Sequence, residues 1–300
     1  MAFAQRQGAP GRCAPAGLGS LMAAALPWLF VGLFLFFVAA FLAAPTAVLV
    51  IQSFSGAHGF TLDYIAGLLD PQYRLAFENS ILLGITSALA GLVFGALLAN
   101  AVAAPGAPPA LRGFITSLSA VAANFAGVPL AFAFISTLGS LGMVTIMLRH
   151  LGIDIYGMGF SLYSITGLTI TFAYFQIPLM LIIIFPAIAG LRAQWREAAE
   201  NLGATRLQYW RLVAVPVLTP SLLGAFLLLF GSAFSAFATP FALTDGNIAL
   251  VTIDISNVLS GNVMSDPQVG AALSTGMIIV MTIILLIHAL LTRRAARWRR

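Results

Sequence analysis

Six long stretches without a charged side chain dominate this sequence of 300 residues. A helix needs about 20 apolar residues to cross about 30 Å of hydrocarbon, and every backbone group within it must be hydrogen-bonded internally. Each stretch is long enough for such a helix. We therefore expect an all-α polytopic membrane protein with six transmembrane helices. The predicted spans cover residues 26–51, 79–102, 113–138, 162–190, 212–238 and 268–291.

The ends of the chain differ from this central region. We expect a mobile tail at 1–25, a six-span domain at 26–292 and a basic C-terminus at 293–300. A cleaved signal peptide is the competing interpretation of the first span, because small residues follow Phe41. The uncharged stretch is longer than the apolar core of a signal peptide, about 7–15 residues, so an uncleaved span is favoured.

The composition limits the chemistry available to the chain. Hydrophobic residues make up 60% and charged residues 8%, whereas about a quarter of a soluble protein is charged. The single cysteine, Cys13, excludes a disulfide framework within the chain and a cysteine metal site. All fourteen basic residues are arginine, so the chain lacks a P-loop lysine. It contains no catalytic or metal-binding motif either. We expect no enzyme, metal site or cofactor here, and any ATP and Mg²⁺ must be bound by another polypeptide.

The arginines predict the orientation in the membrane. An even number of spans leaves both termini on one side. The tail, the turn before the third span, the segment at 192–212 and the C-terminus hold twelve of the fourteen arginines. The opposite loops hold the other two and seven of the nine acidic residues. The positive-inside rule therefore predicts that the termini and residues 192–212 are cytoplasmic.

The charged segment at 192–212 has the pattern of two short helices joined by a tight turn. Gly203 can end the first helix because glycine adopts the left-handed conformation at little cost. Thr205 and Gln208 form a capping-box pattern that begins the second helix. Pro216 and Pro220 suit the opening of the next long helix, where a missing N–H costs least.

These residues resemble a known family. Glu197-Ala198-Ala199, Gly203 and Val213-x-Val215-Pro216 are similar to the EAA loop of the permease subunits of bacterial ABC importers. That family usually has Ile and Leu where this chain has the two valines. The resemblance implies the type I importer permease fold, with its core at about 75–290, and a coupling helix that docks into the ATPase subunit. The implied coupling residues are Glu197, Ala198, Ala199, Glu200, Leu202, Gly203 and Pro216.

The resemblance extends along the chain and implies partners. Asn79-Ser80, Tyr163-Ser164 and the run from Tyr174 to Pro178 also match the family. The run from Phe237 to Thr244 is similar to permeases of the polyamine, iron and sulfate group. The implied partners in a bacterial inner membrane are two ATPase subunits, a second permease, identical or homologous, and an extracytoplasmic solute-binding protein. The implied solute is small and polar or charged, a class that includes polyamine-like solutes.

The spans contain neutral polar residues that could contact a solute. The candidates are Asn124, Gln176, Ser232 and Ser235. Polar side chains in a membrane either hydrogen-bond between helices or line a pathway, and both interpretations stay open.

Three other functions compete with this interpretation. A DNA-binding helix-turn-helix is excluded because flanking spans leave no room for its supporting helix. An ion-driven carrier usually needs an ionisable residue within a span, and every acidic residue here lies in a loop or at a span edge. Uptake by the chain alone, driven by an ion gradient, would favour a carrier. A structural or assembly factor is the other alternative, and solute uptake that survives loss of the chain would favour it.

Overall fold

A bundle of long helices forms the body of the protein in the computed structural model, which describes residues 18–56, 59–104, 106–260 and 267–297. Its long elements are α1 (Leu18–Val38), α2 (Ala44–Ser53), α4 (Pro71–Ala103), α5 (Pro109–Asn124), α8 (Ile165–Ala189), α11 (Val215–Phe234) and α14 (Pro267–Arg297). Six helical segments of the described chain are long and apolar enough to cross a membrane. The prediction of an all-α protein with six spanning helices is confirmed.

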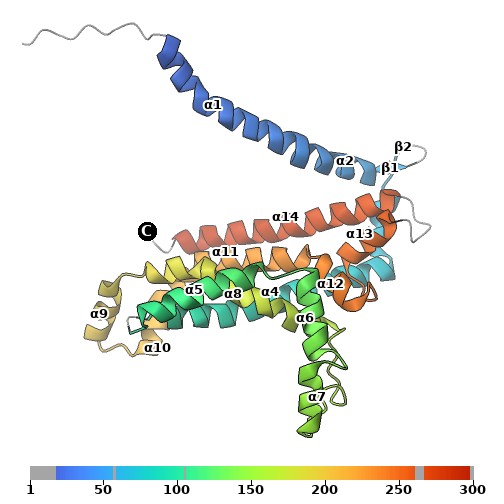
Figure 1. The fold of residues 1–300 in the computed structure, drawn as a ribbon. Helices are drawn as coiled ribbons and strands as arrows, with labels where there is room; N and C mark the ends of the chain where they lie inside the picture. Colours follow the sequence, from blue (N-terminus) through green and yellow to red (C-terminus); the bar gives the residue numbers. More distant parts are fainter. Residues whose placement is uncertain (1–17, 57–58, 105, 261–266, 298–300) are drawn as a thin grey trace, which may run out of the picture.

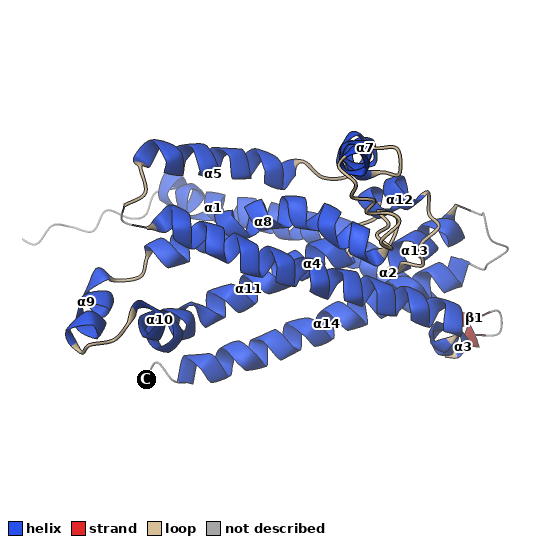
Figure 2. Cartoon of the chain, turned by 90° about the horizontal axis from the view of Figure 1, so that it is seen from below, coloured by secondary structure: helices blue, strands red, loops and turns tan. Residues whose placement is uncertain are grey.

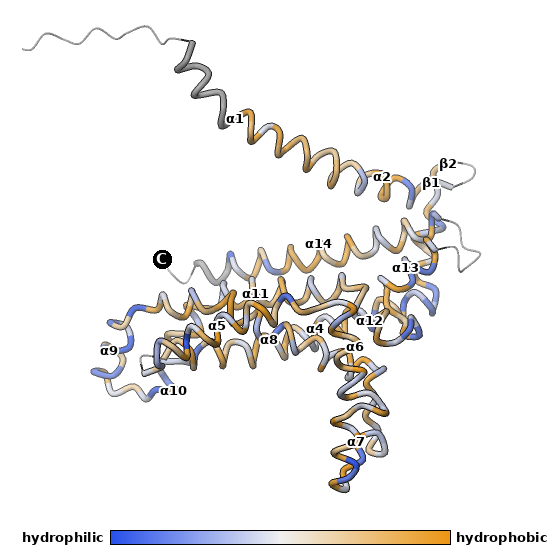
Figure 3. The backbone as a smooth tube through the Cα atoms, viewed as in Figure 1, coloured by the Kyte–Doolittle hydropathy of each residue, from blue (hydrophilic) through white to orange (hydrophobic). Residues whose placement is uncertain are grey.

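Short elements connect these helices. They are β1 (Ser55–Gly56), β2 (Gly59–Phe60), α3 (Asp63–Ala66), α6 (Val128–Leu138), α7 (Met143–His150), α9 (Ala193–Asn201), α10 (Arg206–Tyr209), α12 (Ala238–Thr244) and α13 (Val251–Leu259), with a 3₁₀ turn at Gly67–Leu69. The two strands pair antiparallel in one small hairpin. Polar residues concentrate at the ends of the bundle, while the long helices are mostly apolar (Figure 3).

Helices α4, α5, α8, α11 and α14 run along one axis, so their connections gather at two ends, whereas α1 diverges from this bundle at an angle (Figures 1 and 2). One end carries α9, α10 and the last turns of α14. The other carries the β hairpin, α3, α12 and α13. Residues 18–25, expected in the tail, begin α1, and residues 293–297 continue α14. The remainder of both predicted end segments lies outside the described residues.

The third predicted span needs correction. Instead of one helix over 113–138, α5 ends at Asn124, and the chain turns at Gly127, whose φ is 77°, before α6 begins. Figures 1 and 2 show α5 running along the bundle, whereas α6 and α7 run across it. Residues 128–150 satisfy the length and composition of a span, but α5 takes the third place in the bundle. Apolarity continues through the bend, so hydropathy could not reveal it.

Two π-helical turns precede prolines and keep long helices continuous. One spans Ala39–Ala43 before Pro45, and the other spans Trp210–Ala214 before Pro216. Proline has no N–H group, so it cannot donate the usual hydrogen bond to the carbonyl four residues earlier. In a π turn the backbone hydrogen bonds instead reach five residues back, which shifts the bonding pattern next to the proline. Consequently α10 and α11 form one helical run, Arg206–Phe234, in place of the two separate helices that the sequence predicted.

The core of the bundle is centred on α4, α8 and α11. Leu181, Ile184, Leu229 and Phe230 are buried where these helices meet. At Gly91 and Gly95, α4 approaches α8 closely. A Cβ on Gly95 would come within 2.5 Å of the Met180 Cβ and 2.7 Å of the Ile177 carbonyl oxygen. Glycine therefore lets two backbones touch here.

Candidate functional site

The helix–turn–helix between α8 and α11 forms as the sequence predicts. Gly203 has a φ of 77°, and its amide donates to the Glu200 carbonyl at 2.9 Å. The next amide, of Ala204, donates to the Ala199 carbonyl at 2.9 Å. The Thr205 hydroxyl accepts from the Gln208 amide, and the Gln208 side chain accepts from the Thr205 amide. Local hydrogen bonds at both ends of the turn therefore hold α9 against α10.

The outer face of this segment exposes apolar side chains. Leu202 is 88% exposed and Leu207 is 78% exposed, beyond the end of the bundle. Glu197 is exposed on α9 as well. Glu200 pairs with Arg196 at 3.2 Å and lines an inward pocket, whereas Glu197 does not line it. Of the remaining predicted coupling residues, Ala198 and Pro216 are exposed and Ala199 is half-buried.

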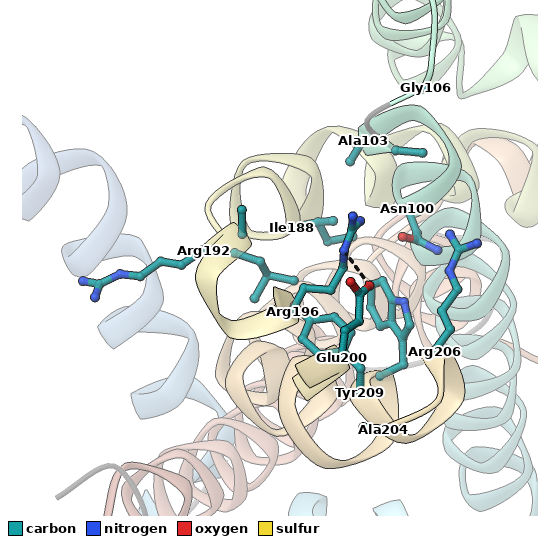
Figure 4. A pocket seen from close by; sticks show the side chains of 14 residues that line it. Asn100, Ala103, Gly106, Ile188, Arg192, Arg196, Glu200, Ala204, Arg206 and Tyr209 are labelled. Carbon is teal, nitrogen blue, oxygen red and sulfur yellow. Dashed lines mark ion pairs between the residues drawn. The ribbon is translucent and has the colours of Figure 1, made fainter. Parts of the chain in front are cut away.

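That pocket has a volume of about 600 Å³. It lies between α9–α10 and the ends of α4 and α8, and Figure 4 shows its lining side chains. Its polar groups come mainly from Asn100, Arg196, Glu200 and Arg206. The sequence alone gives no sign of this pocket, because its walls come from three separate parts of the chain.

Gln176 is fully buried and joins three helices. Its side-chain amide donates to the Leu229 carbonyl at 3.2 Å and lies 3.4 Å from the Ser87 hydroxyl. Its Oε1 atom has no hydrogen-bond partner among the described residues. This geometry is that of an interhelical contact.

The other pathway candidates lie toward the opposite end of the bundle from α9. Ser232 lines a cavity of about 280 Å³ between α5, α8 and α12. Asn124 and Ser235 are exposed, and each donates to a carbonyl of its own helix, at 2.7 Å. The four candidates therefore do not form one cluster. Thr239, which the prediction missed, lines the cavity and accepts from the Gly127 amide at 2.9 Å, so it ties α12 to the bend before α6.

No group of His, Cys, Asp or Glu in the described residues is arranged to hold a metal ion.

Comparisons with known proteins give these features a context. No protein-family model matches the sequence. The chain is 26% identical over 274 residues to the sulfate transport system permease protein CysT of Salmonella typhimurium, covering 91% of this chain and 94% of that protein. It is 28% identical over 242 residues to the spermidine/putrescine permease PotB of Salmonella typhimurium, covering 76% and 78%.

A solved structure agrees with both relatives. The fold matches a chain of a bacterial alginate ABC transporter, crystallised with an alginate pentasaccharide-bound periplasmic protein, at a TM-score of 0.70 and 19% identity. The match covers 92% of this chain and 97% of that one. In sequence and in fold, the chain is therefore similar to the permease subunits of ABC importers. Its relatives are transport permeases rather than enzymes, and its six apolar helices agree with a multi-pass inner-membrane protein.

Proposed function

We propose that this permease forms half of a two-permease solute pathway and that α9–α10 docks on a separate ATPase subunit. The observation that carries the proposal is the exposure of Leu202 and Leu207 on a segment whose turn is fixed by hydrogen bonds. Exposed apolar side chains on a rigid surface are typical of a protein contact. Glu197 adds a charged group beside them.

The helical run from α10 through α11 would connect the ATPase contact to the solute pathway. It begins in the docking segment at Arg206 and, near its other end, contributes Ser232 to the wall of the 280 Å³ cavity. A helix transmits displacement along its axis because its side chains are packed on neighbours. Closure of two ATPase subunits would thus move the cavity wall through this run. The ATP and Mg²⁺ would bind to those partner subunits.

The second permease would complete the pathway. Asn124 is exposed at the end of α5, one residue beyond the cavity-lining Ala123. Phe237 of the same cavity is 37% exposed. A facing subunit, identical or homologous, would cover both side chains and enclose a path between the two chains.

The solute is proposed to be small and polar or charged, a class that includes polyamines. Support comes from relatives named for sulfate and for spermidine and putrescine. The cavity walls carry no charged side chain, so they offer little selectivity of their own. An extracytoplasmic solute-binding protein, such as the periplasmic protein in the alginate complex, would supply it.

Reconstitution tests the proposal. Liposomes holding this chain with its ATPase, second permease and loaded binding protein should accumulate solute only with ATP. Omission of the ATPase should abolish uptake. Uptake by this chain alone under an ion gradient would contradict the proposal and favour an ion-driven carrier.

Orientation is tested separately with single cysteines. If the arginine-rich end is cytoplasmic, Ser260→Cys should react with an impermeant reagent outside intact cells, and Gln208→Cys only after lysis. Both positions are exposed, and they lie at opposite ends of the bundle. Each cysteine is introduced into a variant that lacks Cys13, so that only the new side chain can react. The opposite labelling would reverse the proposed topology.

A further inference from the structure

The 600 Å³ pocket behind α9–α10 combines charged walls with an apolar floor. Its volume lies within the range of small-molecule sites, about 300–1,000 Å³. Ala103, Ile188 and Leu191 form apolar surface at the ends of α4 and α8. Trp210 also lines it, and tryptophan is enriched where a membrane meets water. The pocket therefore lies at the ends of two candidate membrane spans, next to a residue type that favours the membrane–water interface.

Its charge is positive. Arg192, Arg196 and Arg206 line the pocket together with one carboxylate, Glu200. Glu200 is occupied by Arg196 at 3.2 Å, and Arg192 points away, over the Trp195 ring at 5.6 Å. The Arg206 guanidinium points toward Asn100, from α4 (Figure 4).

Arg206 and Asn100 are left with unused hydrogen-bonding capacity. Within the described residues, neither side chain has a protein hydrogen-bond partner, and Arg206 has no ion-pair partner. Basic residues often stabilise the carbonyls at a helix C-terminus, and α4 and α8 both end here. At α4 that role belongs to Arg112, whose Nε donates to the Val102 carbonyl at 3.2 Å. Arg206 makes no such bond, so helix capping does not account for it.

We propose that this pocket binds a phosphate group through Arg206, Arg196 and Asn100, whether the phosphate is free or carried by an anionic lipid. Guanidinium groups match phosphate oxygens in paired hydrogen bonds, and the amide supplies a further donor. Basic pockets between the cytoplasmic ends of spanning helices suit lipid headgroups. The apolar floor suits the glycerol and first methylenes of a lipid. This inference does not depend on docking to an ATPase.

Binding can be measured on the full-length purified chain in a non-ionic detergent. The thermal unfolding midpoint would be followed during separate titrations with short-chain phosphatidylglycerol, phosphatidylcholine and inorganic phosphate, at constant ionic strength. Phosphatidylglycerol should raise the midpoint of the wild-type chain at concentrations where phosphatidylcholine does not. The response to inorganic phosphate separates the two sources: a matching rise indicates that the free ion binds, and its absence indicates that the lipid is required.

Three variants test whether the pocket is responsible. Arg206→Gln should weaken the apparent affinity about tenfold, as expected for one charge-assisted hydrogen bond. Arg211→Gln is the matched control. It also removes one exposed positive charge from the same helical run, but Arg211 does not line the pocket. Glu200→Gln removes the only carboxylate of the pocket and frees Arg196, so it should strengthen binding.

Equal affinities for the Arg206→Gln and Arg211→Gln variants would overturn the proposal, because binding would then reflect diffuse charge. A wild-type chain that responds to none of the phosphate-bearing probes would overturn it too. If Arg206→Gln does not fold, Glu200→Gln decides: unchanged or weaker binding contradicts the proposed site.

Discussion

The docking segment α9–α10 and the cavity bounded by α5, α8 and α12 are built in opposite ways. In the docking segment, Gly203 and the Thr205–Gln208 capping box fix the conformation through neighbours in sequence. In the cavity, Thr239 holds Gly127 across 112 residues of chain. Local hydrogen bonds allow the first region to project from the bundle with its conformation intact. The second region keeps its shape only while distant helices stay packed. Substitutions in the docking segment should therefore reduce uptake without reducing protein abundance, whereas substitutions in the packed region should also reduce stability.

The largest effect is expected at Gly203. Gly203→Val puts a β-branched side chain at a φ of 77°, at a backbone cost of about 1–2 kcal/mol, although a Cβ there meets no atom within 4 Å. The turn should change and ATP-dependent uptake should fall to near background, while the protein still accumulates in the membrane. Solute uptake and protein abundance are the measurements.

Two controls accompany that substitution. Gly203→Asn should retain most activity, because asparagine tolerates the left-handed conformation. Gly152→Val makes the same change at a φ of 83°, in the loop after α7. It should leave uptake close to wild type. If both valine variants lose uptake equally, the proposal that the docking segment has a special role in transport is contradicted.

The next largest effect tests the packed region. Gly95→Ala forces a Cβ to within 2.5 Å of the Met180 Cβ, so α4 and α8 must separate, at a cost of about 1–3 kcal/mol. Thermal stability and abundance should fall together with uptake. Gly91→Ala is the matched control, since its nearest contacts are at 3.0 Å, and it should lose less. If Gly91→Ala lowers stability, abundance and uptake more than Gly95→Ala does, the inference that α4 and α8 are packed more tightly at Gly95 is wrong.

Gln176 distinguishes a packing role from a pathway role. Gln176→Leu removes the contacts to Ser87 and Leu229, with a loss of about 1 kcal/mol for each hydrogen bond. Thermal stability should fall while uptake per folded molecule changes little. Asn124→Leu, at an exposed position bonded within its own helix, should leave stability unchanged. Stable Gln176→Leu protein with low uptake would instead indicate solute contact.

The smallest effect concerns Asp254 in α13, outside the candidate spans. Burial raises the pKa of this carboxyl from 3.8 to about 6, and its Oδ2 atom lacks a hydrogen-bond partner among the described residues. The folded form thus holds a proton that the unfolded form releases between these pH values, so stability should fall as the pH rises from about 4 through 6.

Asp254→Asn should therefore unfold at a higher temperature than the wild type at pH 8 and show no such advantage at pH 4. Asp245→Asn, in the exposed turn after α12, is the control. An advantage of the asparagine variant that is the same at both pH values would show that burial of the charge is not its cause.

The sequence by itself determined the number and apolarity of the spans and the conformation of the α9–α10 turn. Both depend on information that is local in the chain. A span depends on the length of an uncharged stretch, and the turn depends on Gly203 and on the capping box between Thr205 and Gln208. The same locality accounts for the family resemblance, which depends on short motifs.

Tertiary structure decided the rest. The bend at Gly127 is apolar on both sides, so nothing in the hydropathy pattern separates α5 from α6. The roles of Gln176 and Ser232 depended on which helices face them, although both had the same description as neutral polar residues within spans. Arg206 and Asn100 line the same pocket because α4 ends close to the point where α10 begins. Periodicity fixes which face of a helix a residue occupies, but only packing fixes what that face meets.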